Sequence, residues 1–388
     1  MTSRTQSTFA PPVMEAQRWV AGKTFSDCQL INVSQAAPVE PPPIALVNHM
    51  AQVIHDEDTH LYGPILGLPA LRSELAGHWS RSYGGDIHSN HVGITSGCNQ
   101  AFSAAIAMLC GQDDEVILPT PFYFNHKMWL DMAGVRTATL ACRSNMIPDP
   151  EEAAQLITGK TRAIVLVTPN NPCGVEYPAD IIMKFYELAK ARGIALIIDE
   201  TYRDFHSQTG APHNLFHKKD WEDTLIQLYS FSKAYRLTGH RVGSVIASEP
   251  RIAEIEKFLD TVSICPNQLG QKAALWGLQN LGEWLANERL EILSRRSLIE
   301  KNFPRLAAKS WELLGLGAYF AYLKHPFNMS SDTVARHLVS DASVLTLPGT
   351  MFVTDTDRSG EGQLRIAFAN IDSPRINLLF DRLEKVIL

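Results

Sequence analysis

The stretch S-F-S-K-A-Y-R-L-T-G-H-R-V-G, Ser230 to Gly243, carries more chemical information than any other part of this chain. It continues an apolar run that predicts a buried strand, and it places Lys233 between Ser230 and Arg241. A lysine amine can form a Schiff base with an aldehyde, and a hydroxyl beside a guanidinium binds phosphate. The stretch therefore indicates a cofactor that carries both an aldehyde and a phosphate.

Pyridoxal phosphate is the cofactor that combines these two groups. Lys233 would bind its aldehyde, while Ser230 and Arg241 would hold its phosphate. The alternative is an ordinary surface loop. Most lysines are solvated, and the pattern S-x-S-K occurs often by chance. Other parts of the chain have to decide between the two interpretations.

The composition excludes several classes of protein. A chain of 388 residues with 45% hydrophobic residues predicts a large core and two domains. The net charge of −6 and the lack of a basic run argue against nucleic-acid binding. No apolar stretch approaches the roughly 18 residues that span a bilayer, and no signal peptide is expected. Six cysteines without a C-x-x-C pair predict neither zinc nor disulfides. We expect a soluble, cytoplasmic protein.

Short apolar runs alternate with helical stretches through the middle of the chain. This alternation predicts an α/β fold, with a mostly parallel seven-stranded sheet flanked by helices. A large domain is expected over 45–285, and a smaller α+β domain over 1–44 plus 286–388. The strands are predicted at 92–95, 115–118, 135–140, 163–167, 194–198, 225–228 and 242–247, and helices at 99–109, 179–191 and 271–296.

Asp199 ends a wholly apolar strand in the segment I-I-D-E-T-Y. Open α/β sheets bind ligands beyond the carboxyl ends of their strands, so this carboxylate is placed to face a ligand. It would pair with the protonated nitrogen of the pyridine ring, and Tyr202 would donate to the ring's phenolate oxygen. The alternative role of Asp199 is a helix cap, which is frequent after a strand.

Three further segments also follow predicted strands. T-P-N-N-P-C-G gives Asn171 as a second donor to the ring oxygen, although such a string is first of all a turn. I-T-S-G-C-N predicts a helix start whose backbone amides, at Gly97, Cys98 and Asn99, cradle a phosphate. Tyr123 would stack on the pyridine face, or else be an ordinary core aromatic.

Taken together, these motifs resemble the class I/II aminotransferases, the pyridoxal-phosphate enzymes with the aspartate aminotransferase fold (fold type I). The order of the motifs along the chain is the same, over about residues 62 to 365. The resemblance implies the roles given above for Lys233, Asp199, Asn171, Tyr202, Ser230, Arg241, Tyr123 and the loop from Gly97 to Asn99.

The resemblance also implies two roles that the residues alone do not suggest. Tyr62, in L-Y-G-P, matches a tyrosine that reaches the neighbouring site in a homodimer. Arg365, in Q-L-R-I-A-F-A, matches the arginine that holds the substrate's α-carboxylate, with Asn171 beside it. The segment G-A-Y-F-A-Y, 317–322, is expected to be framework of the smaller domain.

The implied activity is transfer of an amino group from an L-amino acid to a 2-oxo acid by a ping-pong mechanism, with Lys233 moving the α-proton. Asn99 stands where some dicarboxylate-specific bacterial members have a lysine, and no arginine lies between Arg251 and Arg289. We therefore expect neutral or aromatic donors, although Lys257 and Lys272 remain candidates for a second carboxylate. Residues 36–38 stand where many relatives have a glycine, and we expect their larger side chains to narrow the substrate pocket.

Other enzymes of this fold use the same residues. A β-lyase or a cyclopropane-forming synthase is therefore an alternative activity. A regulator that senses pyridoxal phosphate and binds DNA through an added domain is a third alternative. It is disfavoured because the first predicted strand of the fold begins close to the N-terminus.

Overall fold

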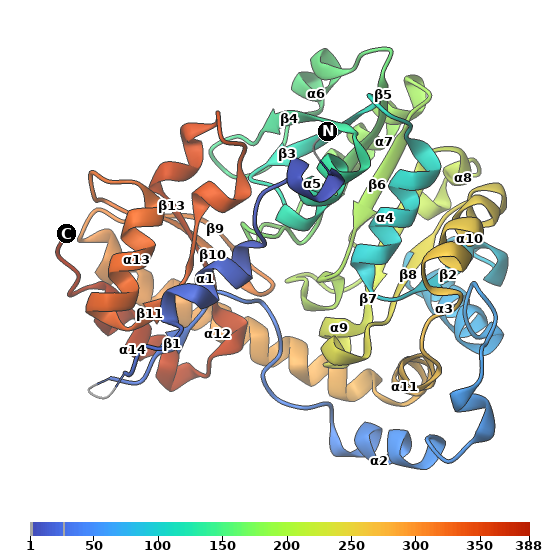
Figure 1. Ribbon diagram of the computed structural model, residues 1–388, viewed down its shortest axis with the longest axis horizontal. Coiled ribbons are helices and arrows are strands. Elements are labelled where there is room, and N and C mark those ends of the chain that lie inside the picture. Colours follow the sequence, from blue (N-terminus) through green and yellow to red (C-terminus); the bar gives the residue numbers. More distant parts are fainter. Residues whose placement is uncertain (1–2, 26–27) are drawn as a thin grey trace.

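The computed structural model describes residues 3–25 and 28–388, and its main feature is a seven-stranded sheet (Figure 1). The strand order is β2-β8-β7-β6-β5-β3-β4, and β8 runs antiparallel to both of its neighbours while the other pairs are parallel. The predicted α/β class and mostly parallel sheet are thus confirmed. The strands are β2 (Val92–Thr95), β3 (Glu115–Thr120), β4 (Arg136–Ala141), β5 (Thr161–Val167), β6 (Ala195–Asp199), β7 (Leu225–Ser230) and β8 (Gly243–Ile246).

Helices cover both faces of this sheet, because strands such as β6 carry apolar side chains on both faces. Its side chains alternate, so that Ala195 and Ile197 join one hydrophobic cluster while Leu196 and Ile198 join another. One cluster is completed by α4 (Cys98–Leu109), α5 (Phe124–Ala133) and α10 (Glu249–Ser263). The other is completed by α2 (Ile44–Val53), α3 (Pro69–Tyr83), α6 (Pro150–Leu156), α7 (Ala179–Ala191), α8 (Trp221–Thr224), α9 (Phe231–Ala234) and α11 (Gln268–Asn280).

The single long helix predicted over 271–296 is wrong. The structure has two helices, α11 and α12 (Gly282–Ala307), separated by Leu281. Leu281 leaves the helical conformation at ψ 22° and packs into the core with an exposed fraction of 6%. Gly282 follows it and has a low helix propensity, so ending one helix and starting another here costs little free energy. The amphipathic pattern continues across the break, which is why the sequence alone suggested one helix.

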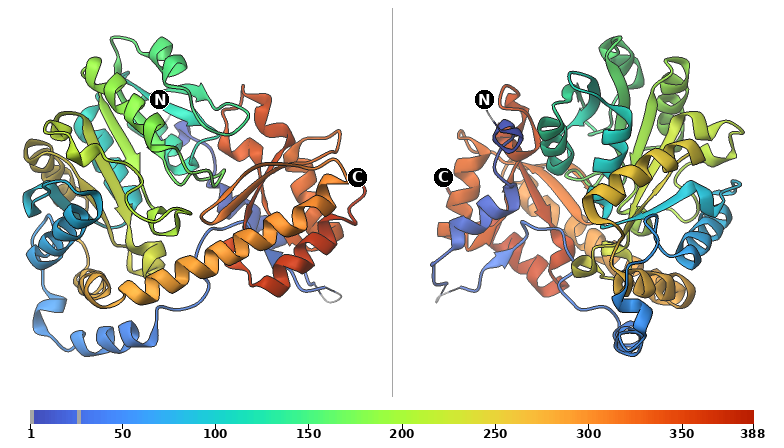
Figure 2. Two further views of the ribbon diagram at one scale, coloured as in Figure 1. Left: turned by 180° about the vertical axis from the view of Figure 1, so that it is seen from behind. Right: turned by 45° about the vertical axis from the view of Figure 1, so that its right-hand side comes forward.

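A second, four-stranded sheet lies beside the first, and α12 runs from α11 to this smaller sheet (Figure 2). Its order is β12-β13-β10-β9. The segment 317–322 forms part of β9 and β10 in this sheet, as expected for framework. The elements of this part are α1 (Pro12–Val20), β1 (Ile31–Asn32), β9 (Glu312–Gly317), β10 (Phe320–Lys324), α13 (Ser331–Ala342), β11 (Val344–Leu345), β12 (Leu347–Pro348), β13 (Gln363–Ala367) and α14 (Ser373–Leu383).

The N-terminal segment packs with this smaller part of the chain. Ile31 of β1 pairs with Val344 of β11, and Ala16 and Trp19 of α1 belong to the same hydrophobic cluster as α13, α14 and the four-stranded sheet. The division into 45–285 and 1–44 plus 286–388 stays a prediction, and α12 runs without interruption through its second boundary. Within the residues described, no helix combines the length and apolar character needed to cross a membrane.

Candidate active site

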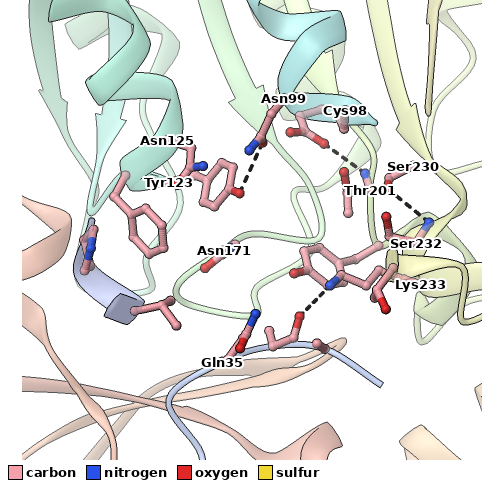
Figure 3. Close-up of a pocket in the computed structure, with 18 of the residues that line it drawn as sticks. Gln35, Cys98, Asn99, Tyr123, Asn125, Asn171, Thr201, Ser230, Ser232 and Lys233 are labelled. Atoms are coloured by element: carbon pink, nitrogen blue, oxygen red, sulfur yellow. Dashed lines mark hydrogen bonds between the residues drawn. The ribbon is translucent and has the colours of Figure 1, made fainter. Parts of the chain in front are cut away.

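A cavity of 490 Å³ lies where the carboxyl ends of β6 and β7 face the smaller sheet (Figure 3). Asp199 ends β6, Ser230 ends β7, and Lys233 follows on the short helix α9. Arg365 reaches the cavity from β13, and Ala36 reaches it from the N-terminal segment. The cavity therefore joins residues that are far apart in the sequence, at the edge where open α/β sheets bind ligands.

Lys233 is the lysine that lines this cavity. Its amine donates a hydrogen bond to the carbonyl of Ala36. Burial lowers the pKa of Lys233 to about 7, and the positive charges of Arg241 and Arg365 contribute to the shift. A large fraction of the amine is therefore neutral near pH 7, which is the form that reacts with an aldehyde and accepts a proton.

Asp199 is a buried acid with two fixed partners. Its Oδ1 accepts a hydrogen bond from the backbone of Thr201 at 3.0 Å, and its Oδ2 lies 3.2 Å from Nε2 of His126. Burial opposes ionisation of this carboxyl, but the contacts with His126 and Thr201 outweigh it and lower the pKa of Asp199. The side chain is thus a permanent negative charge facing the cavity.

One end of the cavity is suited to an anion. Nη1 of Arg241 donates to the carbonyl of Thr238 at 3.0 Å and lies 3.5 Å from the hydroxyl of Ser232. The hydroxyl of Ser230 accepts from the backbone of Ser232 at 3.2 Å. Cys98 and Asn99 line this end at the first turn of α4, where backbone amides have no helical partner.

Gly97 takes part in a different way from the one predicted. Its amide already donates to the carbonyl of Thr95 at 2.8 Å, so it is not available to a ligand in this structure. Gly97 has a φ of +90°, and a Cβ there would lie 2.3 Å from Nη2 of Arg241. The glycine therefore provides room for the guanidinium, and the amides of Cys98 and Asn99 remain to receive an anion.

Arg365 is a buried cation that has no acidic partner among the residues described. It is 2% exposed, its Nη1 donates to Oδ1 of Asn171 at 2.9 Å, and its Nη2 donates to the carbonyl of Ser34. The rings of Phe320 and Phe352 each lie 5.0 Å from the guanidinium carbon. Its Nε has no hydrogen-bond partner within the described part of the chain. Such a charge is costly unless a ligand supplies the missing anion.

Two aromatic residues frame the cavity between these charges. Tyr123 donates from its hydroxyl to Oδ1 of Asn99 at 3.3 Å. Tyr202 is buried, with its ring centre 5.3 Å from that of Tyr319 and 5.9 Å from Nζ of Lys233. Burial raises the pKa of Tyr202 well above its usual value, so its hydroxyl keeps its proton and can donate.

The structure adds residues that the sequence did not single out. Thr201, Ser232 and Thr238 also line the cavity, and His126 supports Asp199 from behind. His126 stands three residues after Tyr123 in the same quoted segment, but nothing in the sequence shows that it faces β6. The first turns of α1 and the side chain of Gln35 line the entrance, and no local pattern marks them.

Tyr62 does not lie in the cavity of its own chain. It is 79% exposed, on the loop between α2 and α3. Its predicted role in a neighbouring site therefore stays a prediction.

The fold and the cavity bring one lysine, one buried carboxylate and two arginines together at the edge of the sheet. The family model for aminotransferase class I and II matches residues 29–383. An aspartate aminotransferase of Pyrococcus horikoshii is 30% identical over 340 residues, which cover 86% of this chain and 84% of that protein. An aromatic aminotransferase of Arabidopsis thaliana is 25% identical over 355 residues, covering 89% and 86%.

A solved structure has the same fold. The aspartate aminotransferase from Thermus thermophilus with maleate superposes with a TM-score of 0.89 at 21% identity, covering 100% of this chain and 99% of that one. The chain belongs to the class I and II aminotransferases, and it is an enzyme that transfers amino groups.

Proposed function

We propose that this aminotransferase uses pyridoxal phosphate to move an amino group from a neutral or aromatic L-amino acid to a 2-oxo acid by a ping-pong mechanism. The observation that carries the proposal is one cavity with a lysine of pKa about 7, a buried carboxylate and a phosphate-type anion site. These groups match the aldehyde, the ring nitrogen and the phosphate of that cofactor.

The residues present fit the cofactor. Arg241, Ser230 and the first amides of α4 would hold the phosphate, and the space that a Cβ at Gly97 would fill is needed for Arg241. Asp199 would pair with the ring nitrogen, Asn171 and Tyr202 would donate to the ring oxygen, and Tyr123 would stack on the ring. When bound, pyridoxal phosphate supplies an electron sink for the charge left at the substrate's α-carbon.

The protein's own groups then have defined tasks. Arg365 binds the α-carboxylate of the amino acid, and Asn171 holds the guanidinium in place at 2.9 Å. Lys233 would hold the cofactor through its aldehyde, and its neutral amine would take the proton from the substrate's α-carbon and deliver it to the cofactor. The pKa of about 7 leaves this amine free to act as a base near neutral pH.

The charges around the cavity support a neutral donor. Its cationic lining residues in the described structure are Lys233, Arg241 and Arg365, and each already has a task. Lys272 is instead paired with Asp56 and Asp58, at 3.1 and 2.5 Å. Lys257 is paired with Glu254 on the surface. The entrance is lined by apolar and amide side chains, among them Val13, Met14, Gln17, Gln35, Phe124 and Asn125.

A donor screen tests the proposed function. Purified protein loaded with pyridoxal phosphate is mixed with single amino acids, and the visible spectrum is followed as the cofactor accepts the amino group. Phenylalanine, tyrosine and methionine should react at least about tenfold faster than aspartate, because a second carboxylate meets no unpaired cation. Equal rates for aspartate and phenylalanine would contradict the neutral preference, and release of ammonia without a 2-oxo acid acceptor would indicate a lyase.

The exposed surface around Tyr62 supports a homodimer as part of the proposal. Gly63, next to Tyr62, donates its amide to Sγ of Cys265 at 3.4 Å, which brings the end of α10 beside this loop. Several large apolar side chains are exposed on these two segments and on α2. They are Ile44, Ile54, Leu61, Val262 and Ile264. Exposed apolar groups in one region are typical of an interface, and a second copy would bring its Tyr62 toward this chain's site.

We expect Tyr62→Phe to weaken the binding of pyridoxal phosphate by about tenfold, because one hydrogen bond to a charged phosphate is lost. The mass in solution, measured by light scattering, should remain twice 43.1 kDa, since the ring stays in place. Leu290→Met is a control at another exposed apolar residue, which is 57% exposed and lies outside the cavity lining. A wild-type monomer that binds the cofactor with full affinity would refute the role of Tyr62.

A further inference from the structure

The turn that follows β6 has two faces with different surroundings. Asp199, Thr201 and Tyr202 line the cavity. Glu200 and Arg203 lie outside the cavity lining, and both are buried: Glu200 is 0% exposed and the side chain of Arg203 is 9% exposed. The proposed reaction uses the first group and gives no task to the second. The presence of two buried charges behind the site therefore needs its own explanation.

The carboxylate of Glu200 is held by three other parts of the chain. Tyr83 of α3 donates its hydroxyl to Oε2 at 2.8 Å, and the amide of Gln227 on β7 donates to the same oxygen. Nε2 of His213 lies 3.4 Å from it. Gln227 also donates to the hydroxyl of Tyr83 at 3.0 Å and accepts from the indole of Trp79.

Arg203 extends the same group of contacts. Its guanidinium carbon lies 4.5 Å from the ring centre of Trp79 and 4.8 Å from that of Tyr83. Its Nη1 lies 3.7 Å from Asp204, whose other oxygen accepts from the hydroxyl of Tyr229 on β7 at 2.6 Å. We call this set the buried network, with the members Trp79, Tyr83, Glu200, Arg203, Asp204, His213, Gln227 and Tyr229.

Stability alone does not account for the buried network. Charges buried in a protein core cost desolvation free energy, and apolar replacements are often as stable. Within the residues described, Oε1 of Glu200 and Nε of Arg203 have no hydrogen-bond partner, which adds to that cost. What the network does provide is directional contact, because its hydrogen bonds fix the turn after β6 against β7 and against α3.

The buried network connects two strand ends that carry groups of the proposed reaction. β6 and β7 are neighbours, and Asp199 stands opposite Leu228. Gln227 and Tyr229 flank Leu228, and the chain continues from there to Lys233. The network thus joins the turn that carries Asp199 to the strand that leads to Lys233.

Resting on the proposed function, we infer that Glu200 and Arg203 are positioning residues that fix the separation between Asp199 and Lys233 from behind the sheet. A displacement of a reactive group by about 1 Å is enough to slow a reaction roughly 100-fold. Arg365 lies on β13, outside the network, so the binding of the substrate's carboxylate does not depend on it.

Two variants and a matched control test this inference. Tyr83→Phe removes one hydroxyl from the carboxylate of Glu200, and Glu200→Gln removes the charge with little change of shape. Tyr186→Phe is the control, because Tyr186 is a fully buried tyrosine of the same hydrophobic cluster whose hydroxyl contacts Asp220 at 3.4 Å, away from the turn. For each protein we would measure the melting temperature without cofactor, the Kd of pyridoxal phosphate by titration, and kcat and KM.

We expect Tyr83→Phe and Glu200→Gln to weaken cofactor binding by at least fivefold relative to Tyr186→Phe and to lower kcat by at least tenfold, with KM for the amino acid within about twofold. If Glu200→Gln does not fold, Tyr83→Phe alone decides. Unchanged Kd and kcat in a variant whose melting temperature falls as in the control would overturn the inference and show a purely structural network. Failure of the wild type to bind pyridoxal phosphate would instead overturn the proposed function.

Discussion

Replacing Lys233 with alanine should abolish transamination, with kcat reduced by roughly 10⁵-fold or more. In the proposed mechanism the lysine supplies both the amine that bonds to the cofactor and the base that moves the α-proton, and its pKa of about 7 suits both tasks. The other cations that line the cavity are guanidinium groups, which stay protonated and cannot act as bases. Steady-state kinetics with a reactive donor and a 2-oxo acid measure the loss.

A second measurement identifies the lysine that bonds to the cofactor. Borohydride reduction followed by peptide mass spectrometry should find the cofactor attached at position 233 in the wild type and unattached in Lys233→Ala. Lys257→Ala is a suitable control, since that side chain is 71% exposed and pairs with Glu254 on the surface. Appreciable turnover by Lys233→Ala, or label at another lysine of the wild type, would refute the assignment.

Asp199→Asn should lower kcat by roughly 10²–10³-fold, because it removes a preorganised charge from the reacting ring. Asparagine has nearly the same shape and can still accept a hydrogen bond from the backbone of Thr201, so the fold should survive. The charge is what changes: asparagine cannot keep the ring nitrogen protonated, and the electron sink becomes weaker. KM for the donor should change little, since Arg365 is untouched.

The same variant offers an independent readout. The absorption of the bound cofactor should shift and should change with pH over a different range, because the protonation of its ring is no longer held by Asp199. Asp220→Asn, at a surface carboxylate that pairs with Lys190, serves as the control. An Asp199→Asn enzyme with the wild-type kcat would show that Asp199 is a helix cap and nothing more.

Much of the site was predictable because of where the motifs stand. Asp199 and Ser230 each end an apolar strand, Lys233 follows Ser230 by three residues, and parallel strands bring their carboxyl ends to one edge. Their meeting in one cavity follows from the strand order without any knowledge of side-chain positions. The preference of β-branched and aliphatic residues for strands made these apolar runs easy to recognise.

Other features depend on contacts between distant segments, which no local pattern reveals. His126 is three residues from Tyr123, yet only the packing of α5 against β6 puts it 3.2 Å from Asp199. The break at Leu281 was missed because the apolar periodicity continues across it. Gly97 was expected to offer its amide, but the segment between β7 and β8, which contains α9, places Arg241 where a side chain would otherwise stand.

The order of strands and motifs in the sequence by itself determined the fold and the class of enzyme, and it placed Asp199 and Lys233 at or near strand ends, since these features depend on residue type and on position relative to the strands. Only the tertiary structure decided what surrounds them. It lowered the pKa of Lys233 by burying the amine near two guanidinium groups, gave Arg365 no acidic partner among the residues that the structure describes, and placed Glu200 and Arg203 behind the sheet. Burial and electrostatic fields are sums over many distant neighbours, and no short stretch of sequence contains them.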